Sequence, residues 1–220
     1  MIRLRLLFGK TVWMRYTAHL DTQRTLERTI RRAQLPLAYS EGFTPHAKIH
    51  FASALPLGCT SIGELADIWL TEEIAAEECL SALIRSAPAG LTFFRVWNVP
   101  LNEAELQNRI QSAEYRCFLL KNKDQLRQRI EALLASTSLP HKRRGREIDL
   151  RLLIEQLYEE NDPLNSIQED GVVWQAAQQC IAMRLKAGEG ASGRPDEVLE
   201  ALAIPLHEAQ IQRVRIILRD

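Results

Sequence analysis

The sequence lacks an excess of either charge. Its 220 residues contain 28 Lys and Arg and 28 Asp and Glu, so the formal net charge is +0. A chain without net charge has no overall attraction to nucleic acids or to membrane surfaces. Any function that depends on charge must therefore come from local clusters of side chains.

The sequence also lacks a long, uninterrupted apolar run. Its N-terminal segment, MIRLRLLFGKTVW, contains arginines within the apolar stretch. This segment is too short and too interrupted for a signal peptide or a membrane span. We therefore expect a cytoplasmic protein without a membrane partner.

Cysteine is scarce and widely spaced. The four cysteines form neither a C-x-x-C nor a C-x₃-C-x₂-C motif, so no zinc or iron–sulfur site is indicated. We expect no cofactor. In a reducing compartment such residues behave as small, buried apolar side chains. They are Cys59, Cys79, Cys117 and Cys180.

The composition is that of a globular protein, with 46% hydrophobic and 25% charged residues. This balance excludes disordered and fibrous classes. A chain of this length can form one large domain or two domains of about 100 residues each.

Hydrophobic periodicity predicts the order β-α-β-β-α-β in the first half of the chain. Apolar residues alternate with arginines from Ile2 to Phe8, which is typical of a half-buried strand. An extended piece follows over 12–16, and Pro36 stops the helix that comes next. The predicted elements are strands at 2–8, 49–55, 65–70 and 91–99, and helices at 18–34 and 76–87.

The same order is predicted again in the second half. Its elements are strands at 115–119, 148–154, 172–185 and 214–218, and helices at 126–134 and 195–202. Two such units imply an α+β fold of two tandem ferredoxin-like (βαββαβ) units with antiparallel sheets. We expect domains at 1–111 and 112–220, joined by a connector over 100–114 that holds a short helix through Leu106 and Ile110.

The first predicted helix carries a basic stripe. Arg24, Arg28 and Arg32 follow one another at four-residue steps, with Arg31 beside them. Like charges at this spacing repel by a few tenths of a kcal/mol each, and Glu27 offsets only part of this. Either an anion binds along the stripe, or the stripe is a solvated face whose arginine stems cover apolar surface.

A second basic cluster, HKRRGR, contains Lys142, Arg143 and Arg144. Basic side chains on a loop suit phosphate contacts, although a plain solvated loop explains the same composition. The glycine-rich segment GEGASGRP, which ends in Arg194 and Pro195, leads into a helix. It lacks the G-K-[ST] ending of a Walker motif, so we predict no nucleotide hydrolysis.

The histidines allow an enzymatic alternative. His46 and His50 are four residues apart, but in an extended segment this places them about 13 Å apart, too far to share one metal ion. If His19, Glu41 and His46 met at one end of the sheet, they would provide general acid–base groups.

Three stretches resemble a known family. They are AHLDTQRTLERTIRRAQLPLAYSEGFTPHAKIHFASALPLG, RRGREIDLR and GRPDEVLEAL. Together they resemble the bacterial radical SAM-associated family with the domain of unknown function 2344, over nearly the whole chain. On this chain the family motif falls on His19, Leu20, Asp21, Arg28, Arg32, Ser40, Glu41, Gly42, Phe43, Pro45, His46, Lys48, Pro56, Leu57 and Gly58, and later on Lys142, Gly145, Asp149, Arg194, Pro195, Glu197 and Arg213.

The resemblance implies a module encoded with a radical SAM protein, near genes for ribonuclease G and ribosomal proteins. The chain itself has no cysteine triad for an iron–sulfur cluster, so radical chemistry belongs to the partner.

Our hypothesis is an accessory module without catalytic activity of its own, which recognises RNA or a ribosome-related ribonucleoprotein through a basic surface. One rival is a metal-independent RNA-processing enzyme of tandem ferredoxin-like fold. The other is a protein-interaction module that docks a radical SAM enzyme. The expected binding residues are His19, Asp21, Arg24, Arg28, Arg32, Ser40, Glu41, His46, Lys48, Lys142, Arg143, Arg144 and Arg194.

Overall fold

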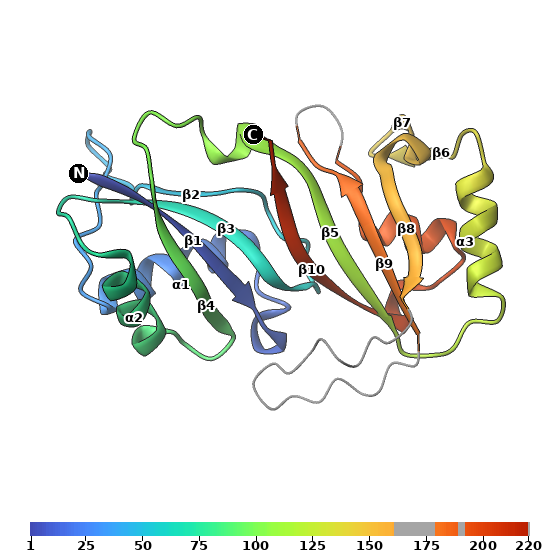
Figure 1. The fold of residues 1–220 in the computed structure, drawn as a ribbon, viewed down its shortest axis with the longest axis horizontal. Coiled ribbons are helices and arrows are strands. Elements are labelled where there is room, and N and C mark those ends of the chain that lie inside the picture. The colour runs from blue at the N-terminus through green and yellow to red at the C-terminus, as the bar shows by residue number, and fades with distance from the viewer. Residues whose placement is uncertain (161–178, 189–191, 220) are drawn as a thin grey trace. The chain divides into compact units, whose positions relative to one another are not determined.

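The computed structural model of the protein describes residues 1–160, 179–188 and 192–219 (Figure 1). The chain divides into two compact units, unit 1 over Met1–Ile110 together with Arg219, and unit 2 over Gln111–Leu218. The described ranges hold four α-helices, and their strands pair mostly antiparallel. The predicted α+β class is confirmed. No helix in these ranges is long and apolar enough to cross a bilayer.

Unit 1 contains a four-stranded antiparallel sheet in the order β4-β1-β3-β2. Its 3₁₀ turns are η1 and η2. The extended piece predicted over 12–16 is wrong, because Met14 N–H donates to the Thr11 carbonyl and Arg15 N–H donates to the Val12 carbonyl, which forms η1. The elements are β1 (Ile2–Lys10), η1 (Val12–Met14), α1 (His19–Arg32), β2 (Ile49–Phe51), β3 (Thr60–Leu70), α2 (Ala76–Ser86), β4 (Leu91–Val99) and η2 (Leu106–Arg109).

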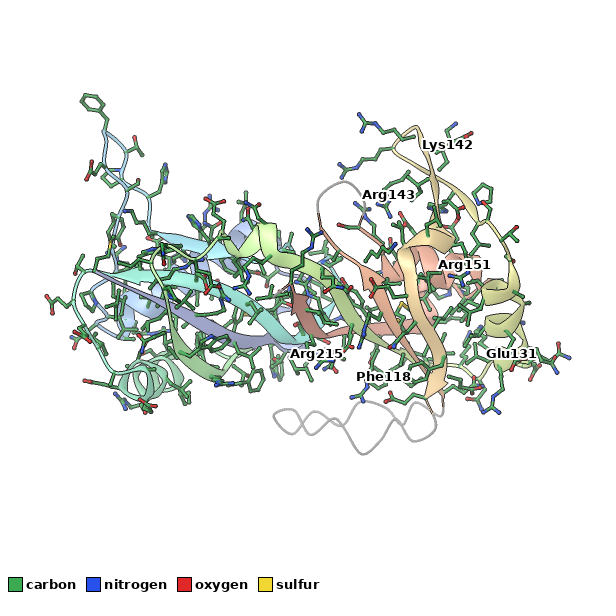
Figure 2. The ribbon with its side chains drawn as sticks, turned by 45° about the horizontal axis from the view of Figure 1, so that its top comes forward. Phe118, Glu131, Lys142, Arg143, Arg151 and Arg215 are labelled. Carbon is green, nitrogen blue, oxygen red and sulfur yellow. The ribbon has the colours of Figure 1, made fainter. Side chains whose placement is uncertain are left out.

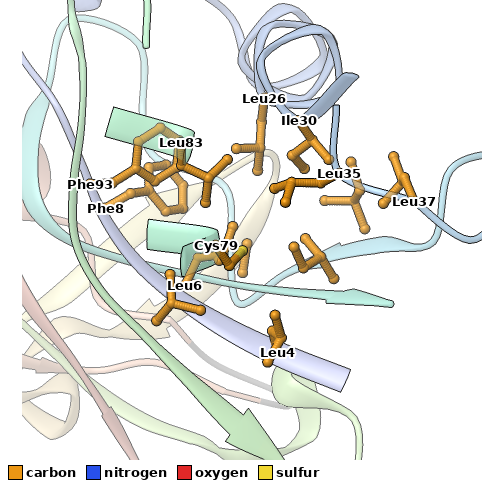
Figure 3. Packing of buried hydrophobic residues seen from close by; sticks show 14 of the residues in the cluster. Leu4, Leu6, Phe8, Leu26, Ile30, Leu35, Leu37, Cys79, Leu83 and Phe93 are labelled. Carbon is orange, nitrogen blue, oxygen red and sulfur yellow. The ribbon is translucent and has the colours of Figure 1, made fainter. Parts of the chain in front are cut away.

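The core of unit 1 lies between the sheet and its two helices (Figure 3). Leu4, Leu6 and Phe8 alternate along β1 and are at most 1% exposed. Because side chains alternate across a strand, these three face α1 and α2 together. From the helices, Leu26 and Leu83 fill the space above them.

Unit 2 contains a sheet in the order β10-β5-β9-β8 and a separate hairpin of β6 and β7. The strand predicted over 148–154 is wrong: β7 ends at Asp149, whose carboxylate caps η3 by accepting from Arg151 N–H. The elements are β5 (Ile110–Leu119), α3 (Leu126–Ala135), β6 (Pro140–Arg143), β7 (Arg146–Asp149), η3 (Leu150–Leu153), β8 (Ile154–Glu160), β9 (Gln179–Lys186), α4 (Pro195–Ala201), η5 (Leu206–Glu208) and β10 (Ala209–Leu218).

Other local predictions have mixed outcomes. The connector holds the 3₁₀ turn η2, but it ends at Arg109, and Ile110 already begins β5. All four cysteines are buried, as predicted. The part of the predicted extended segment at 172–178, and residues 189–191 of the glycine-rich segment, lie outside the described residues.

The face of the unit 1 sheet away from the helices carries a buried charge cluster. Arg3 and Arg5 on β1 are each 3% exposed, and Asp67 on β3 is 0% exposed. Arg3 Nη2 lies 2.6 Å from Asp67 Oδ2, and Arg5 Nε lies 2.7 Å from Oδ1. Arg3 also donates to the Glu103 carbonyl at 2.6 Å, which ties the segment after β4 to the sheet.

Asp67 compensates both buried guanidinium groups. Burial alone would lower the pKa of Arg5, but hydrogen bonds and attraction from Asp67 and Glu103 raise it above its usual value. Removal of one member of such a cluster leaves uncompensated charge in the interior, which is strongly destabilising.

We predict that Asp67→Asn lowers the free energy of unfolding by about 3 to 5 kcal/mol, because two buried arginines lose their shared counter-charge. The urea midpoint of the purified chain measures this loss. The control is Asp21→Asn, which removes a pair with Arg24 whose side chains are 58% and 68% exposed. That change should cost less than about 1 kcal/mol, and equal losses in the two variants would contradict the prediction.

Candidate functional site

Helix α1 presents basic side chains on its solvent side. Its buried positions recur at helical spacing and are Thr22, Leu26, Thr29 and Ile30. The helix ends at Arg32, and Gln34 just beyond it adopts a left-handed φ of 57°. The exposed side between these buried positions carries Arg24, Arg28 and Arg31, which we call the arginine row.

The arginines of α1 differ in what they already bind. Arg24 Nη1 lies 3.2 Å from the exposed carboxylate of Asp21. Arg32 donates from Nε to the Ser86 carbonyl at 2.9 Å, so it caps the C-terminal end of α2. Within the described ranges, the side chains of Arg28 and Arg31 have no ion-pair or hydrogen-bond partner. Arg32 therefore has a structural contact, whereas Arg28 and Arg31 are available to a ligand.

The motif residues around Gly42 form a short hairpin, which we call the signature hairpin and define as residues 39–47. Tyr39 and Ala47 form a β-bridge at its base. Ser40 N–H donates to the His46 carbonyl at 2.8 Å, and His46 N–H donates to Ser40 Oγ at 2.9 Å. Gly42 has a φ of 123°, which favours glycine there. Ser40 therefore builds the turn.

The tip of the signature hairpin is exposed. The side chains of Glu41, Phe43 and His46 all point into solvent, and Phe43 reaches 110% of its reference exposure. Lys48, just after the hairpin, is half-buried, and its N–H donates to the Ala38 carbonyl. The predicted contacts Glu41 and His46 are thus accessible to a partner.

His19 lines a small pocket of unit 1. Its ring stands edge-on to Phe51, with 5.3 Å between the ring centroids. Lys10, Ser53 and Glu64 also line this pocket. Lys10 Nζ donates to the Thr17 carbonyl at 2.8 Å, and Glu64 accepts a hydrogen bond from Ser61 Oγ.

Sequence reasoning missed Lys10 and Glu64. Both are nearly buried, at 2% and 4% exposed. Each is a charged residue inside an otherwise strand-like stretch, GKTVW and IGELADIWL. A buried charge at such a position is a signal for a site, but the strand pattern alone does not show which residues meet it.

The structure does not bring His19, Glu41 and His46 together. His19 packs beside Phe51, which pairs with Ala66 on β3. The signature hairpin starts beyond Leu37, which bridges Leu70. Ala66 and Leu70 are four residues apart along β3, which corresponds to about 13 Å. His19 is therefore distant from Glu41 and His46, and the three groups do not share one acid–base site.

The basic cluster of unit 2 is the hairpin of β6 and β7. Its turn residues Arg144 and Gly145 have φ values of 48° and 81°, the positive pair typical of a type I′ turn. Side chains alternate along β6, so Arg143 and Lys142 face opposite sides (Figure 2). Lys142 and Arg144 are exposed, whereas Arg143 is half-buried.

Arg143 is held by α4. Its Nε lies 2.6 Å from Oε1 of Glu197, and its Nη2 bonds to Oε2. Glu197 is only 5% exposed, and His141 Nε2 lies 3.6 Å from the same carboxylate. Hydrogen bonding to Glu197 raises the pKa of Arg143. Arg194, also predicted as a contact, is half-buried and directly precedes Pro195 at the start of α4.

A polar hollow lies over β5, β8 and β9 of unit 2, lined in part by Gln156 and Tyr158. Its charges neutralise one another. Arg116 pairs with Glu160 at 2.8 Å, and Glu114 pairs with Arg184 and with Arg215. Burial would raise the pKa of Glu114, but hydrogen bonds from the two arginines lower it. The hollow therefore does not offer unpaired cations to an anionic ligand.

In the described parts of the chain, no group of three or more His, Cys, Asp or Glu side chains is placed to hold a metal ion.

The predicted site residues include two kinds. One kind makes internal contacts, namely Arg32, Ser40 and Arg143. The other kind is exposed, namely Arg28, Glu41, His46, Lys142 and Arg144.

Comparison with known proteins adds one match. A family model described as an uncharacterized protein conserved in bacteria (DUF2344) matches residues 3–195. No curated protein matches the sequence. The match extends from unit 1 into unit 2 as far as the start of α4, and it includes the signature hairpin and the β6–β7 hairpin.

We predict that Arg143→Gln destabilises the protein by about 1.5 to 3 kcal/mol, because it removes charge-assisted hydrogen bonds and leaves Glu197 nearly buried without its partner. Thermal and urea unfolding measure the loss. Arg144→Gln is the matched control, since it lies in the same hairpin and is exposed; it should change stability by no more than about 0.5 kcal/mol. A control as unstable as Arg143→Gln would refute the assignment.

Proposed function

The chain belongs to the bacterial family with the domain of unknown function 2344, and we propose that it is a binding module that recognises RNA or a ribonucleoprotein through exposed basic side chains. The observation that carries the proposal is the availability of these cations. Arg28 and Arg31 in unit 1, and Lys142 and Arg144 in unit 2, are exposed rather than buried in internal pairs. Exposed lysines and arginines that can approach phosphates supply most of the affinity for nucleic acid.

The proposal assigns phosphate contacts and specific contacts to different residues. Arg28 and Arg31 would contact phosphate from unit 1, with Arg24 joining them when it leaves Asp21. Lys142 and Arg144 would do so from unit 2. Glu41 and His46 at the tip of the signature hairpin would make specific contacts, since an exposed carboxylate and imidazole can bond to base edges or to protein groups.

We also propose that both units are ferredoxin-like. In unit 1 the strand order β4-β1-β3-β2 combines with two helices in the chain order β-α-β-β-α-β. In unit 2 the order β10-β5-β9-β8 has the same form once the β6–β7 hairpin is treated as an insertion. This fold covers one sheet face with helices and leaves the other face to a linker, a ligand or a partner.

A radical SAM protein acting in the cytoplasm is the partner we propose, and the module would present its RNA or ribonucleoprotein substrate to that enzyme. This partnership comes from the family resemblance. It is tested by copurification of the tagged chain from bacterial cells with and without ribonuclease treatment. A partner retained after ribonuclease binds the protein directly.

One observation favours a second candidate, a metal-independent RNA-processing activity. His19 lies in one pocket with Lys10 and Glu64, three side chains that can transfer protons. Cleavage of RNA by the purified chain in the presence of a chelator, lost in His19→Ala but kept in His46→Ala, would establish this activity.

We predict that replacement of Arg28 and Arg31 by Gln weakens RNA binding and reduces the salt dependence. For single-stranded RNA the slope of log K against log salt should fall by about 0.7 for each phosphate that the variant no longer neutralises. Fluorescence anisotropy with a labelled RNA at several salt concentrations measures both quantities.

The matched control is Arg127→Gln on α3, an exposed arginine outside both basic clusters. It should leave affinity and slope unchanged. Absence of binding by the unaltered chain at low salt would overturn the proposed function, and equal losses in the control would show a dependence on overall charge only.

A further inference from the structure

Two aromatic rings lie exposed just before the arginine row. Trp13 is 70% exposed and Tyr16 is 72% exposed. Large aromatic side chains are costly to leave in water, and they are common at binding surfaces because they bury much area with few rotatable bonds. Leu20, in the first turn of α1, is 64% exposed and lies between these rings and the arginine row in the sequence.

The segment that carries these rings is held by backbone hydrogen bonds. Thr11 N–H donates to the Gly90 carbonyl at 2.9 Å, and Gly58 N–H donates to the Arg15 carbonyl at 2.9 Å. Gly58 has a φ of 84°, and a Cβ atom at that position would lie 4.0 Å from Cε1 of Tyr16. The Tyr16 ring therefore lies beside the turn that contains Gly58.

Arg15 adds a cation to the rings. Its guanidinium carbon lies 4.8 Å from the centroid of the Tyr16 ring. Its Nε atom is buried and has no hydrogen-bond partner in the described residues. An arginine stacked on an aromatic ring is a common neighbour of nucleobases, because both planes accept stacking.

The arginine row continues from this aromatic segment along one side of α1. Leu20, Arg24, Arg28 and Arg31 follow one another at steps of four, four and three residues, all exposed. With a rise of about 1.5 Å per residue, the row extends roughly 16 Å from Leu20 to Arg31. Rings at one end and cations along the side are the two components of a surface for single-stranded nucleic acid.

We propose that Trp13, Tyr16 and the arginine row bind single-stranded RNA, with bases stacked on the two rings and phosphates along the arginines. This rests on the proposed function and narrows its ligand from RNA in general to unpaired RNA. The two exposed rings favour single-stranded over duplex RNA. In a duplex the faces of the bases are already stacked on each other, so the rings have no free base face on which to stack. In a single strand every base offers a free face, whatever its sequence.

The test compares the full chain with the variants Trp13→Ala, Tyr16→Ala and their combination. Binding to a labelled single-stranded oligouridine and to an RNA duplex of equal length is measured by fluorescence anisotropy at several salt concentrations. We expect tighter binding to the single strand and a loss of about tenfold or more for each ring removed. The salt slope should stay unchanged in these variants, because the phosphate contacts remain.

Two controls accompany the test. Trp13→Phe and Tyr16→Phe keep a stacking ring and should retain most of the affinity. Tyr158 in unit 2 is 51% exposed, and Tyr158→Ala should leave the affinity for RNA unchanged. Unfolding midpoints of all variants, expected to match the unaltered chain since both rings are exposed, confirm that folding is intact.

The outcomes separate this inference from the proposed function. Equal affinity for duplex and single strand, or full affinity in the double alanine variant while the Arg28 and Arg31 variant binds weakly, overturns the inference and leaves the proposed function standing. No binding of either RNA at low salt overturns both. Loss, in the double variant, of a protein partner that survives ribonuclease treatment, with RNA binding unchanged, also overturns the inference in favour of protein docking.

Discussion

The compensation of buried arginine charge by Asp67 is the constraint on which unit 1 depends. Arg3 and Arg5 lie on β1, which pairs with β3, and both donate to the carboxylate of Asp67 on β3. Because Arg3 also donates to the Glu103 and Ala104 carbonyls, this cluster fixes the segment after β4 against the sheet. The guanidinium groups of Arg3 and Arg5 are therefore not available to a ligand, and binding by cations in unit 1 is left to arginines that remain exposed.

The need to compensate buried charge also explains the contacts of other arginines in the protein. A guanidinium that is removed from water needs acceptors, and it finds them in Asp67 for Arg3 and Arg5 and in Glu197 for Arg143. Arg28 and Arg31 remain in water and have no such acceptor in the described part of the chain. Net charge of zero hides this division, because the count of positive residues includes arginines that serve only the fold.

Much of the fold could be predicted from the sequence, because alternation in β1 and helical spacing in α1 reflect burial directly. What could not be predicted is which face of a strand meets an opposite charge. The alternation of Arg3 and Arg5 indicates a solvated face, but pairing with β3 places Asp67 against them. In the second half, Leu150 and Leu152 continue the alternation of Ile148, although Asp149 ends the strand and Leu152 is 64% exposed.

The sequence predicts which motif residues lie in the candidate site, but not which of them are exposed. Neighbouring residues of one motif, Arg143 and Arg144, differ in role because Arg143 ends β6 on the side that faces Glu197, whereas Arg144 lies in the turn. The signature hairpin divides in the same way, since Ser40 closes the turn while Glu41 and His46 stay exposed. A family motif therefore mixes residues that build a surface with residues that use it. The proposed recognition of RNA depends on the exposed subset, together with the two rings that precede the first motif stretch.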